Sequence, residues 1–391
     1  MKHLFSSCLF FLSLIYSYAQ SNDCSTKNYF INIDSLKNVS YNNNLSDSLF
    51  VNSSIVLLGE ETHGDGTAFL LKKELAEYLI KNYNYEVILF ENGFYDLSRI
   101  NDLGLVGSDF MKNIYKVWSN SVEFSGMYDL IKSKKIIIGG FDTRNKGVFS
   151  NKNLVSEIDS VTASNNLYNL NNPEYLAFKS TLNSLLKTEF KDTSSAKMRM
   201  NFYRVIDTIT EKRLSKGNDW WVQEFKNLRH FGEQTWAQQT NENEYFRLRD
   251  KYMAENISWL KDNVYKNKKI IVWTANDHAA YLSVPYVRMG NFLRKNYGTK
   301  LACILSSSYK GEYREGKDII TIKKQSKNTI EYYLHSLGIN EGIVVCKNLC
   351  PELSGKKVMD MDKNKSALEL MDAILFIDTM RPSTLIQGRK E

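Results

Sequence analysis

The sequence lacks several features that mark common classes of protein. It has no Gly-x-Ser-x-Gly motif, which disfavours a serine hydrolase built around a nucleophile elbow. It has no long basic run with interleaved aromatic residues, and its 51 basic residues only mildly exceed its 44 acidic ones. We therefore expect no nucleic acid among its partners. We also find no internal repeat and no low-complexity linker, which favours a single domain.

Long apolar runs are scarce, and the clearest one lies at the N-terminus. Met1-Lys2-His3 precedes an almost wholly apolar stretch from Leu4 to Tyr16, and Ser17-Tyr18-Ala19 supplies the small residues of a cleavage site. The stretch is too short to cross a bilayer comfortably, which takes roughly 20 apolar residues. We predict a signal peptide over residues 1–19 and an exported protein, periplasmic or secreted, with no membrane contact after the signal is removed.

Cysteine is scarce as well. After removal of the signal, four cysteines remain: Cys24, Cys303, Cys346 and Cys350. Export permits disulfides, and Cys346 could pair locally with Cys350, but four cysteines allow three pairings and the sequence does not choose among them. Their spacing lacks the second ligand pair of a structural zinc site, which disfavours such a site.

The alternation of strand and helix signals predicts an α/β fold. Short apolar runs typical of buried parallel strands occupy residues 55–58, 87–90, 136–138, 270–273, 301–305 and 374–377. Helical periodicity follows the first of them, over 68–79, with Asp65 or Thr67 available as the N-cap. Residues from about 150 to 262 have almost no β-rich runs. We predict one domain over 20–391, with a mainly parallel, helix-flanked sheet and a large helical insertion over about 150–262 that forms one wall of the active-site cleft.

A polar segment rich in glycine, Gly59 to Gly66, joins the first predicted strand to the first predicted helix. In open α/β sheets, ligands bind beyond the carboxyl ends of the strands, and a helix N-terminus adds free N–H groups. His63 could act there as a base, with Glu60 or Glu61 orienting its ring. The glycines would let the backbone approach a substrate. The alternative is a polar turn whose glycines serve only tight geometry.

Two further strand ends carry polar side chains. Glu91 follows the second strand, and it would share a crevice with His63 if the first and second strands are neighbours. The segment Trp273 to His278 follows the fourth strand and adds a histidine, an amide and a carboxylate. One polar strand end is ordinary, and Glu91 alone could be a solvated turn residue. Three polar strand ends that together carry two of the four histidines of the mature chain favour a functional site. The other two histidines, His230 and His335, lie in helical patterns typical of structural residues.

Arg249 lies on an inward-looking helix face that it shares with Met253, Asn256 and Leu260. A buried arginine needs a partner, which a carboxylate in the crevice or charge on a substrate would supply. The alternative is a surface arginine whose stem lies along the helix while its charge reaches water.

Here the residues resemble a known family. Gly59-Glu60-Glu61-Thr62-His63-Gly64 resembles the Gly-Glu-x-Thr-His-Gly motif of the erythromycin esterase family. The resemblance continues at 90–93, at 249–256, at 273–278 and at 372–378, in the family's order, and it covers the chain from about 50 to 380. One position departs from the family. Where members commonly read Trp-Ala-His-Asn-x-His, this chain has Ala275 in place of the first histidine, and a methyl group cannot donate, accept or titrate.

The resemblance implies a metal-independent esterase without a cofactor, whose partner is a small-molecule ester or lactone; family members open macrolide lactones. It implies that His63 is the general base on water, and that Glu60 and Glu91 orient it, position the water or bind polar groups of the substrate. Arg249 would bind substrate or steady the oxyanion, and His278 would lie near the leaving oxygen. Two further residues are assigned to substrate binding, Asn276 and Trp273. Antibiotic resistance does not follow from the family name.

Two other interpretations stay open. More distant relatives with a similar strand-end Glu and His include metalloproteases, and His63, Glu60, Glu91 and His278 have ligand chemistry that suits a divalent metal. The chain would then be a metal-dependent hydrolase. Alternatively, the change at Ala275 is compatible with a binding protein that kept the pocket and lost the reaction.

Overall fold

The computed structural model describes residues 25–34, 44–104, 108–187, 195–358 and 365–386. The predicted signal peptide and Cys24 lie outside these residues. Cys303 and Cys346 are free and buried, whereas Cys350 is disulfide-bonded. The local Cys346–Cys350 disulfide that the sequence allowed is therefore not formed. Of the helices in the described ranges, none has both the length and the apolar character needed to cross a membrane.

A nine-stranded sheet runs through the centre of the molecule, in the order β1-β8-β9-β6-β2-β5-β3-β4, with β7 paired to β6. The strands are β1 (Phe30–Asn32), β2 (Ile55–Glu60), β3 (Tyr85–Gly93), β4 (Ile137–Asp142), β5 (Lys269–Ala275), β6 (Leu301–Glu315), β7 (Asp318–Ile322), β8 (Glu341–Val345) and β9 (Ala373–Met380). The run from β9 to β4 is parallel throughout, while β1, β7 and β8 pair antiparallel. The predicted mainly parallel sheet is confirmed.

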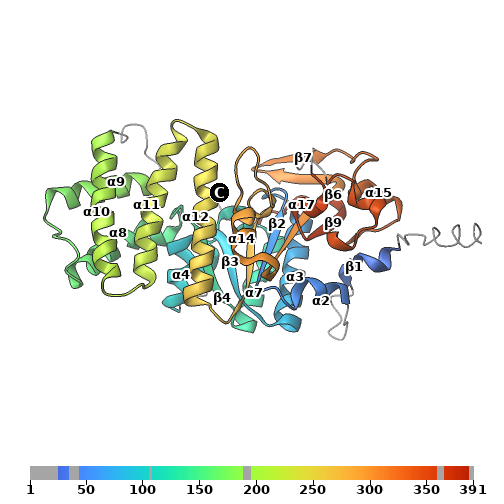
Figure 1. Cartoon of the computed structure of the whole chain (residues 1–391), viewed down its shortest axis with the longest axis horizontal. Coiled ribbons are helices and arrows are strands. Elements are labelled where there is room, and N and C mark those ends of the chain that lie inside the picture. The colour runs from blue at the N-terminus through green and yellow to red at the C-terminus, as the bar shows by residue number, and fades with distance from the viewer. Residues whose placement is uncertain (1–24, 35–43, 105–107, 188–194, 359–364, 387–391) are drawn as a thin grey trace, which may run out of the picture.

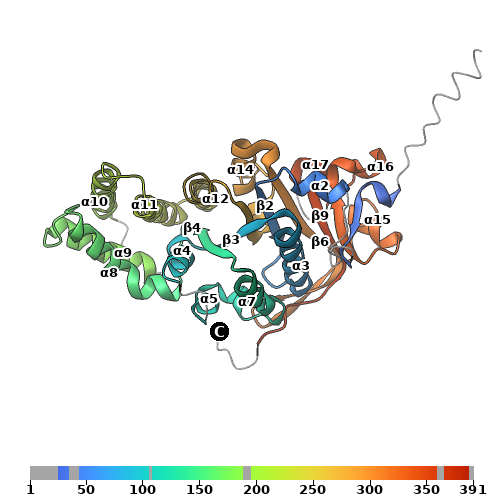
Figure 2. The same cartoon turned by 90° about the horizontal axis from the view of Figure 1, so that it is seen from below.

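Helices cover both faces of this sheet (Figures 1 and 2). On β2, Val56 and Leu58 pack into one apolar cluster with residues of α3 (Gly66–Tyr83) and α7 (Val122–Lys134). Ile55 and Leu57 pack into the opposite cluster with residues of α12 (Glu242–Trp259) and α14 (Met289–Tyr297). A strand buried on both faces must be apolar at every position, and this requirement explains why β2 reads as a continuous hydrophobic run.

The order of the strands corrects one expectation. β2 and β3 are not neighbours, because β5 lies between them and pairs in parallel with both. Trp273 on β5 is level with Leu58 on β2 and with Phe90 on β3. The carboxyl ends of the three strands nevertheless meet at one edge of the sheet, so the polar residues that follow them come together around β5.

Between β4 and β5 the described residues form long helices, which lie to one side of the sheet in Figure 1. They are α8 (Val148–Ser164), α9 (Pro173–Lys187), α10 (Ala196–Leu214), α11 (Trp220–Gln238) and α12. An apolar cluster of their own, which includes Phe178, Phe202 and Phe225, holds the first four together. The division of the chain into one domain with an insertion stays a prediction. The helix that reaches the sheet is α12, which packs on β4 and carries Arg249.

Candidate active site

Glu60 and His63 form a hydrogen-bonded pair at the carboxyl end of β2. Glu60 is fully buried, while 41% of the His63 side chain is exposed. His63 Nδ1 lies 3.1 Å from Glu60 Oε1, which also accepts a hydrogen bond from Trp118 Nε1 at 2.8 Å. Glu60 Oε2 accepts from the ammonium of Lys72. Because a carboxylate only accepts, Nδ1 of a neutral His63 carries the proton, and the lone pair is on Nε2.

The surroundings of His63 act on its pKa in both directions. Burial lowers the pKa, whereas the hydrogen bond to Glu60 and the negative charges of Glu91 and Glu60 raise it; His278 also lowers it. The carboxylates outweigh the other effects, so the pKa of His63 lies above its ordinary value of 6.5. The rings of His63 and Trp118 also form a T-shaped contact, with centroids 5.5 Å apart and planes at 89°. His63 is thus an oriented imidazole whose basicity the carboxylates increase.

The glycines of this loop face the protein itself, which corrects the expectation that they admit a substrate. A side chain at Gly64 would collide with the backbone of Arg314, and one at Gly59 would collide with the Asn276 amide. Gly64 O accepts hydrogen bonds from Arg314 N at 3.2 Å and Ser383 N at 2.8 Å. The β6–β7 hairpin and the C-terminal segment therefore hold the loop in place.

Asp65 occupies the N-cap position of α3, but its carboxylate does not cap the helix. Its two oxygens accept hydrogen bonds from Thr62 N at 2.8 Å and Thr62 Oγ1 at 2.6 Å, which closes the turn that carries His63. Burial raises the pKa of Asp65 to about 6, against the hydrogen bonds from Thr62, which lower it.

Arg249 joins the helical stretch to the ends of β3 and β4. Its Nη2 donates to Glu91 Oε1 and to Asp142 Oδ2, both at 2.7 Å, and Nη1 lies 2.8 Å from His278 Nε2. All these side chains are buried. Burial alone would raise the pKa of Glu91 and of Asp142, but the neighbouring cations more than reverse this, so both pKa values lie below the ordinary range. Asp142 is shared with Arg144, whose Nη2 donates over 2.7 Å.

The second oxygen of Glu91 faces β5. Glu91 Oε2 accepts from Thr274 Oγ1 at 2.7 Å and from Ala275 N at 3.1 Å. Both oxygens of Glu91 are therefore held by the protein, and the methyl group of Ala275 lies where the family commonly has an imidazole. Ala275 is partly exposed beside the buried Glu91.

His278, on the short helix α13 (Asn276–Ala279), is held from both sides. Its Nδ1 lies 2.8 Å from Asp250 Oδ1, which also accepts from Met289 N at 2.9 Å. A guanidinium only donates, so the contact with Arg249 requires an unprotonated Nε2 and a proton on Nδ1. Burial lowers the pKa of His278, but Asp250 and Glu91 raise it further than burial and Arg249 lower it. Protonation of His278 would break its contact with Arg249.

The two residues assigned to substrate binding have partners within the protein. The Asn276 amide donates to Ser306 O at 2.7 Å and accepts from Ser306 N at 3.2 Å, which fastens α13 to β6. Trp273 is fully buried, and its ring centroid lies 4.1 Å from Lys72 Nζ. In this structure neither side chain offers its polar or aromatic surface to a ligand.

The side chains with ligand chemistry do not converge on one point. Within the described ranges, no group of three or more His, Cys, Asp or Glu residues is arranged to hold a metal ion. Glu60 is occupied by Lys72, Trp118 and His63, and both oxygens of Glu91 are occupied as described above. The donor set that suited a metal in the sequence therefore does not fit one in this arrangement.

Sequence reasoning assigned no role to several residues of this cluster, among them Asp142, Asp250, Lys72 and Trp118. Asp250 lies in the family-like block 249–256, and two of the others carried a usable signal. Asp142 ends an apolar strand, as Glu60 does. Lys72 lies at i+4 from Ala68 on the buried face of α3, so it interrupts an apolar stripe in the same way as Arg249. Trp118 comes from a separate short helix, α6 (Lys116–Ser119), which the sequence did not connect with the site.

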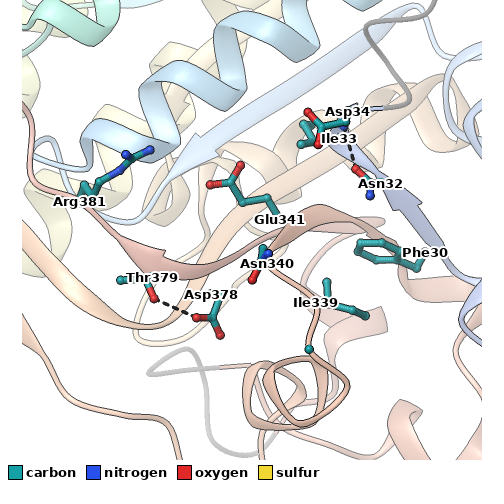
Figure 3. A pocket seen from close by; sticks show the side chains of 11 residues that line it. Phe30, Asn32, Ile33, Asp34, Ile339, Asn340, Glu341, Asp378, Thr379 and Arg381 are labelled. Atoms are coloured by element: carbon teal, nitrogen blue, oxygen red, sulfur yellow. Dashed lines mark hydrogen bonds between the residues drawn. The ribbon is translucent and has the colours of Figure 1, made fainter.

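A cavity of about 660 Å³ lies elsewhere, along β1, β8 and β9 (Figure 3). Phe30, Glu341, Asp378 and Arg381 are among the residues that line it. None of its lining residues belongs to the cluster around His63 and Arg249. The cavity is therefore separate from the candidate site.

Comparisons with known proteins agree with this architecture. The sequence model of the erythromycin esterase family matches residues 132–380, which include Arg249 and the segment 273–278. A putative hydrolase of Bacillus subtilis (strain 168), YbfO, is 27% identical over 312 residues, which are 69% of this chain and 68% of the relative.

Solved structures share the fold at low sequence identity. A protein from Bacillus cereus has a TM-score of 0.72 at 18% identity, covering 93% of this chain and 98% of that one. A succinoglycan biosynthesis protein has a TM-score of 0.71 at 17% identity, covering 92% and 96%. A mutant of the erythromycin esterase EreC in its open conformation has a TM-score of 0.64 at 13% identity, covering 90% and 98%.

Proposed function

Because this chain belongs to the erythromycin esterase family, we propose that it is a hydrolase that cleaves an ester or lactone of a small molecule with water activated by His63. Family membership and the similarity to a putative hydrolase support the reaction class. One observation carries the finer proposal. His63 is a partly exposed histidine whose Nδ1 faces a buried carboxylate, an arrangement that suits a general base.

In the proposed reaction, His63 Nε2 removes a proton from a water molecule, whose oxygen attacks the carbonyl carbon of the substrate. Glu60 holds the imidazole in the required tautomer and stabilises the imidazolium that forms. The imidazolium then returns its proton to the leaving alkoxide as the C–O bond breaks. The products are a carboxylic acid and an alcohol, which remain in one molecule when the substrate is a lactone.

We assign different roles to the remaining predicted residues. Arg249 is buried and engaged by Glu91, Asp142 and His278, so we propose that it positions these groups and does not bind substrate. Glu91 raises the pKa of His63 through its charge. His278, beside both Glu91 and Arg249, is positioned by Asp250. Asn276 fastens α13 to β6 and Trp273 packs against Lys72, so we assign both residues a structural role.

The test is hydrolysis of aryl esters and macrolide lactones by the purified protein, compared with His63→Ala. Removal of a general base is expected to lower kcat by at least about 100-fold. His335→Ala is the matched control, because that partly exposed histidine also has its Nδ1 on a carboxylate, Asp378, but lies on α15 (Ile330–Ser336) outside the cluster. It should retain parental activity.

Each assay is repeated with a chelator. Activity that persists with chelator and is lost in His63→Ala supports a metal-independent esterase. Loss with chelator that a divalent metal restores would favour the metal-dependent alternative. Tight binding without turnover, unchanged in His63→Ala, would favour a binding protein, with Ala275 as the first residue to examine by Ala275→His.

We also propose that the chain is exported, on the strength of the signal-like segment over 1–19. Mass spectrometry of the protein from its native host tests this proposal. Export predicts a chain that begins after Ala19, and an intact Met1 would contradict it.

A further inference from the structure

Lys72 is a buried lysine directly beneath the His63 loop. It belongs to α3, and its side chain is fully enclosed. Its ammonium donates to Glu60 Oε2 and to Thr274 O, the latter at 3.1 Å, and lies over the ring of Trp273. The lysine thus connects β2, β5 and α3 at the point where Glu60 supports His63.

A lysine in this position is costly for the fold. Burial lowers the pKa of Lys72, and the charge of Glu60 opposes that effect. Two apolar residues of similar volume in place of Lys72 and Glu60 would bury the same surface without the desolvation of two charges. The fold alone therefore does not account for a cation here. What the cation contacts is the carboxylate that supports the proposed base.

We propose that Lys72 is a positioning residue of the hydrolytic site, which fixes the Glu60 carboxylate and balances its charge so that His63 remains a neutral base with its proton on Nδ1. This inference rests on the proposed function of His63. Lys72 contacts Glu60, Thr274 and Trp273, so it would act on His63 through Glu60.

The contacts of Glu60 explain how Lys72 would act. Trp118 and His63 share Oε1, while Lys72 holds Oε2, so the carboxylate cannot rotate without losing a partner. Without the ammonium, the uncompensated carboxylate would attract a proton to His63 and favour the imidazolium, which cannot accept a proton from water. The other titratable groups that act on Lys72 or His63 are Asp65, Glu91 and His278.

The experiment measures the pKa of His63 directly by NMR titration of the imidazole, with the signal assigned through His63→Ala. Lys72→Met should raise this pKa by on the order of one unit, and the acidic limb of kcat/KM should move up by the same amount. Lys73→Met is the matched control, since it removes the same charge from the next residue of α3, which is only partly buried. It should leave the pKa unchanged. Lys72→Arg keeps a cation at this position, so its His63 pKa should lie closer to the parental value than the His63 pKa of Lys72→Met.

A folded Lys72→Met protein with the parental His63 pKa would overturn the proposal. If Lys72→Met does not fold, Lys72→Gln is measured in its place, because the amide keeps a hydrogen-bond donor at this position but carries no charge, and the Glu60 carboxylate is retained. The His63 pKa should again rise, and a folded Lys72→Gln protein with the parental His63 pKa would overturn the proposal. The NMR titration tests the coupling of Lys72 to His63 separately from the proposed hydrolysis. A shifted pKa in a protein that hydrolyses nothing would contradict the proposed function but not the coupling of Lys72 to His63.

Discussion

Glu91 on β3 and Arg249 on α12 lie 158 residues apart in the chain, and Arg249 Nη2 donates to Glu91 Oε1 over 2.7 Å. The same nitrogen donates to Asp142 Oδ2 on β4. One guanidinium therefore pairs with two buried carboxylates at adjacent strand ends, and Arg144 adds a second positive charge beside Asp142. The long helical segment between β4 and β5 places it there, which explains how the helices contribute to a site whose loops belong to the sheet.

Arg249→Met should destabilise the protein strongly, because Glu91 and Asp142 stay buried but lose the cation that they share. We expect the free energy of unfolding to fall by about 3–5 kcal/mol, measured by urea denaturation. Arg247→Met is the control: Arg247 pairs with Glu244 one turn away, and both side chains are 39% exposed, so its loss should cost no more than about 1 kcal/mol. Equal losses in the two variants would contradict the structural role of Arg249.

Glu60→Gln should move the acidic limb of the pH–rate profile to lower pH. The neutral form of His63 is the active base, so hydrolysis falls as pH decreases through its pKa, which lies above 6.5. Loss of the Glu60 charge removes a cause of the raised pKa. The check is kcat/KM between pH 5 and 8, with Glu61→Gln, the adjacent carboxylate, as the comparison. An acidic limb of Glu60→Gln at the parental pH would show that protonation of another group limits the rate.

Asn276→Ala should lower stability without changing KM. The substitution removes both hydrogen bonds to the Ser306 backbone and leaves the Ser306 groups unsatisfied, at a cost of about 1–3 kcal/mol. Asn263→Ala, at an exposed position, should change stability by no more than about 0.5 kcal/mol. An increase in KM with unchanged unfolding would instead support the substrate-binding role that the sequence suggested.

Asp96→Asn should flatten the dependence of stability on pH between about 4 and 6. Asp96, on α4 (Phe94–Asp102), is fully buried, and burial raises its pKa from 3.8 to about 6 despite hydrogen bonds from Gly147 N and Ser150 N. Because the pKa of Asp96 is higher in the folded than in the unfolded protein, protonated Asp96 favours the folded state. This contribution to stability is fully present below pH 3.8 and is lost as pH rises through about 6.

The loss that Asp96 causes amounts to about 3 kcal/mol over this range. The measurement is the difference in urea unfolding free energy between pH 4 and pH 6, for the parent and for Asp96→Asn. Asp318→Asn, at an exposed aspartate of β7, should leave the slope intact. If the unfolding free energy of Asp96→Asn changes with pH as much as that of the parent, Asp96 is not buried as the structure describes.

Much of the fold could be predicted from local patterns. The apolar runs that became β2, β3, β4, β5, β6 and β9 were visible because strands buried on both faces are apolar at every position. The antiparallel strands β1, β7 and β8 were missed. β1 has three residues, β7 is largely exposed, and β8 is five residues long, so none has a distinctive run. Their places depend on pairing with β6, β8 or β9, which no local signal encodes.

The sequence by itself determined which residue types stand at the strand ends, because a buried strand must finish in a polar turn at the edge of the sheet. That rule identified His63, Glu60, Glu91 and His278. Only the tertiary structure decided which of these groups meet. The position of β5 between β2 and β3 brings Thr274 and Ala275 to Glu91, and the packing of α12 on β4 brings Arg249 to the same carboxylate. Such contacts join residues from distant parts of the chain, so local periodicity could not reveal them.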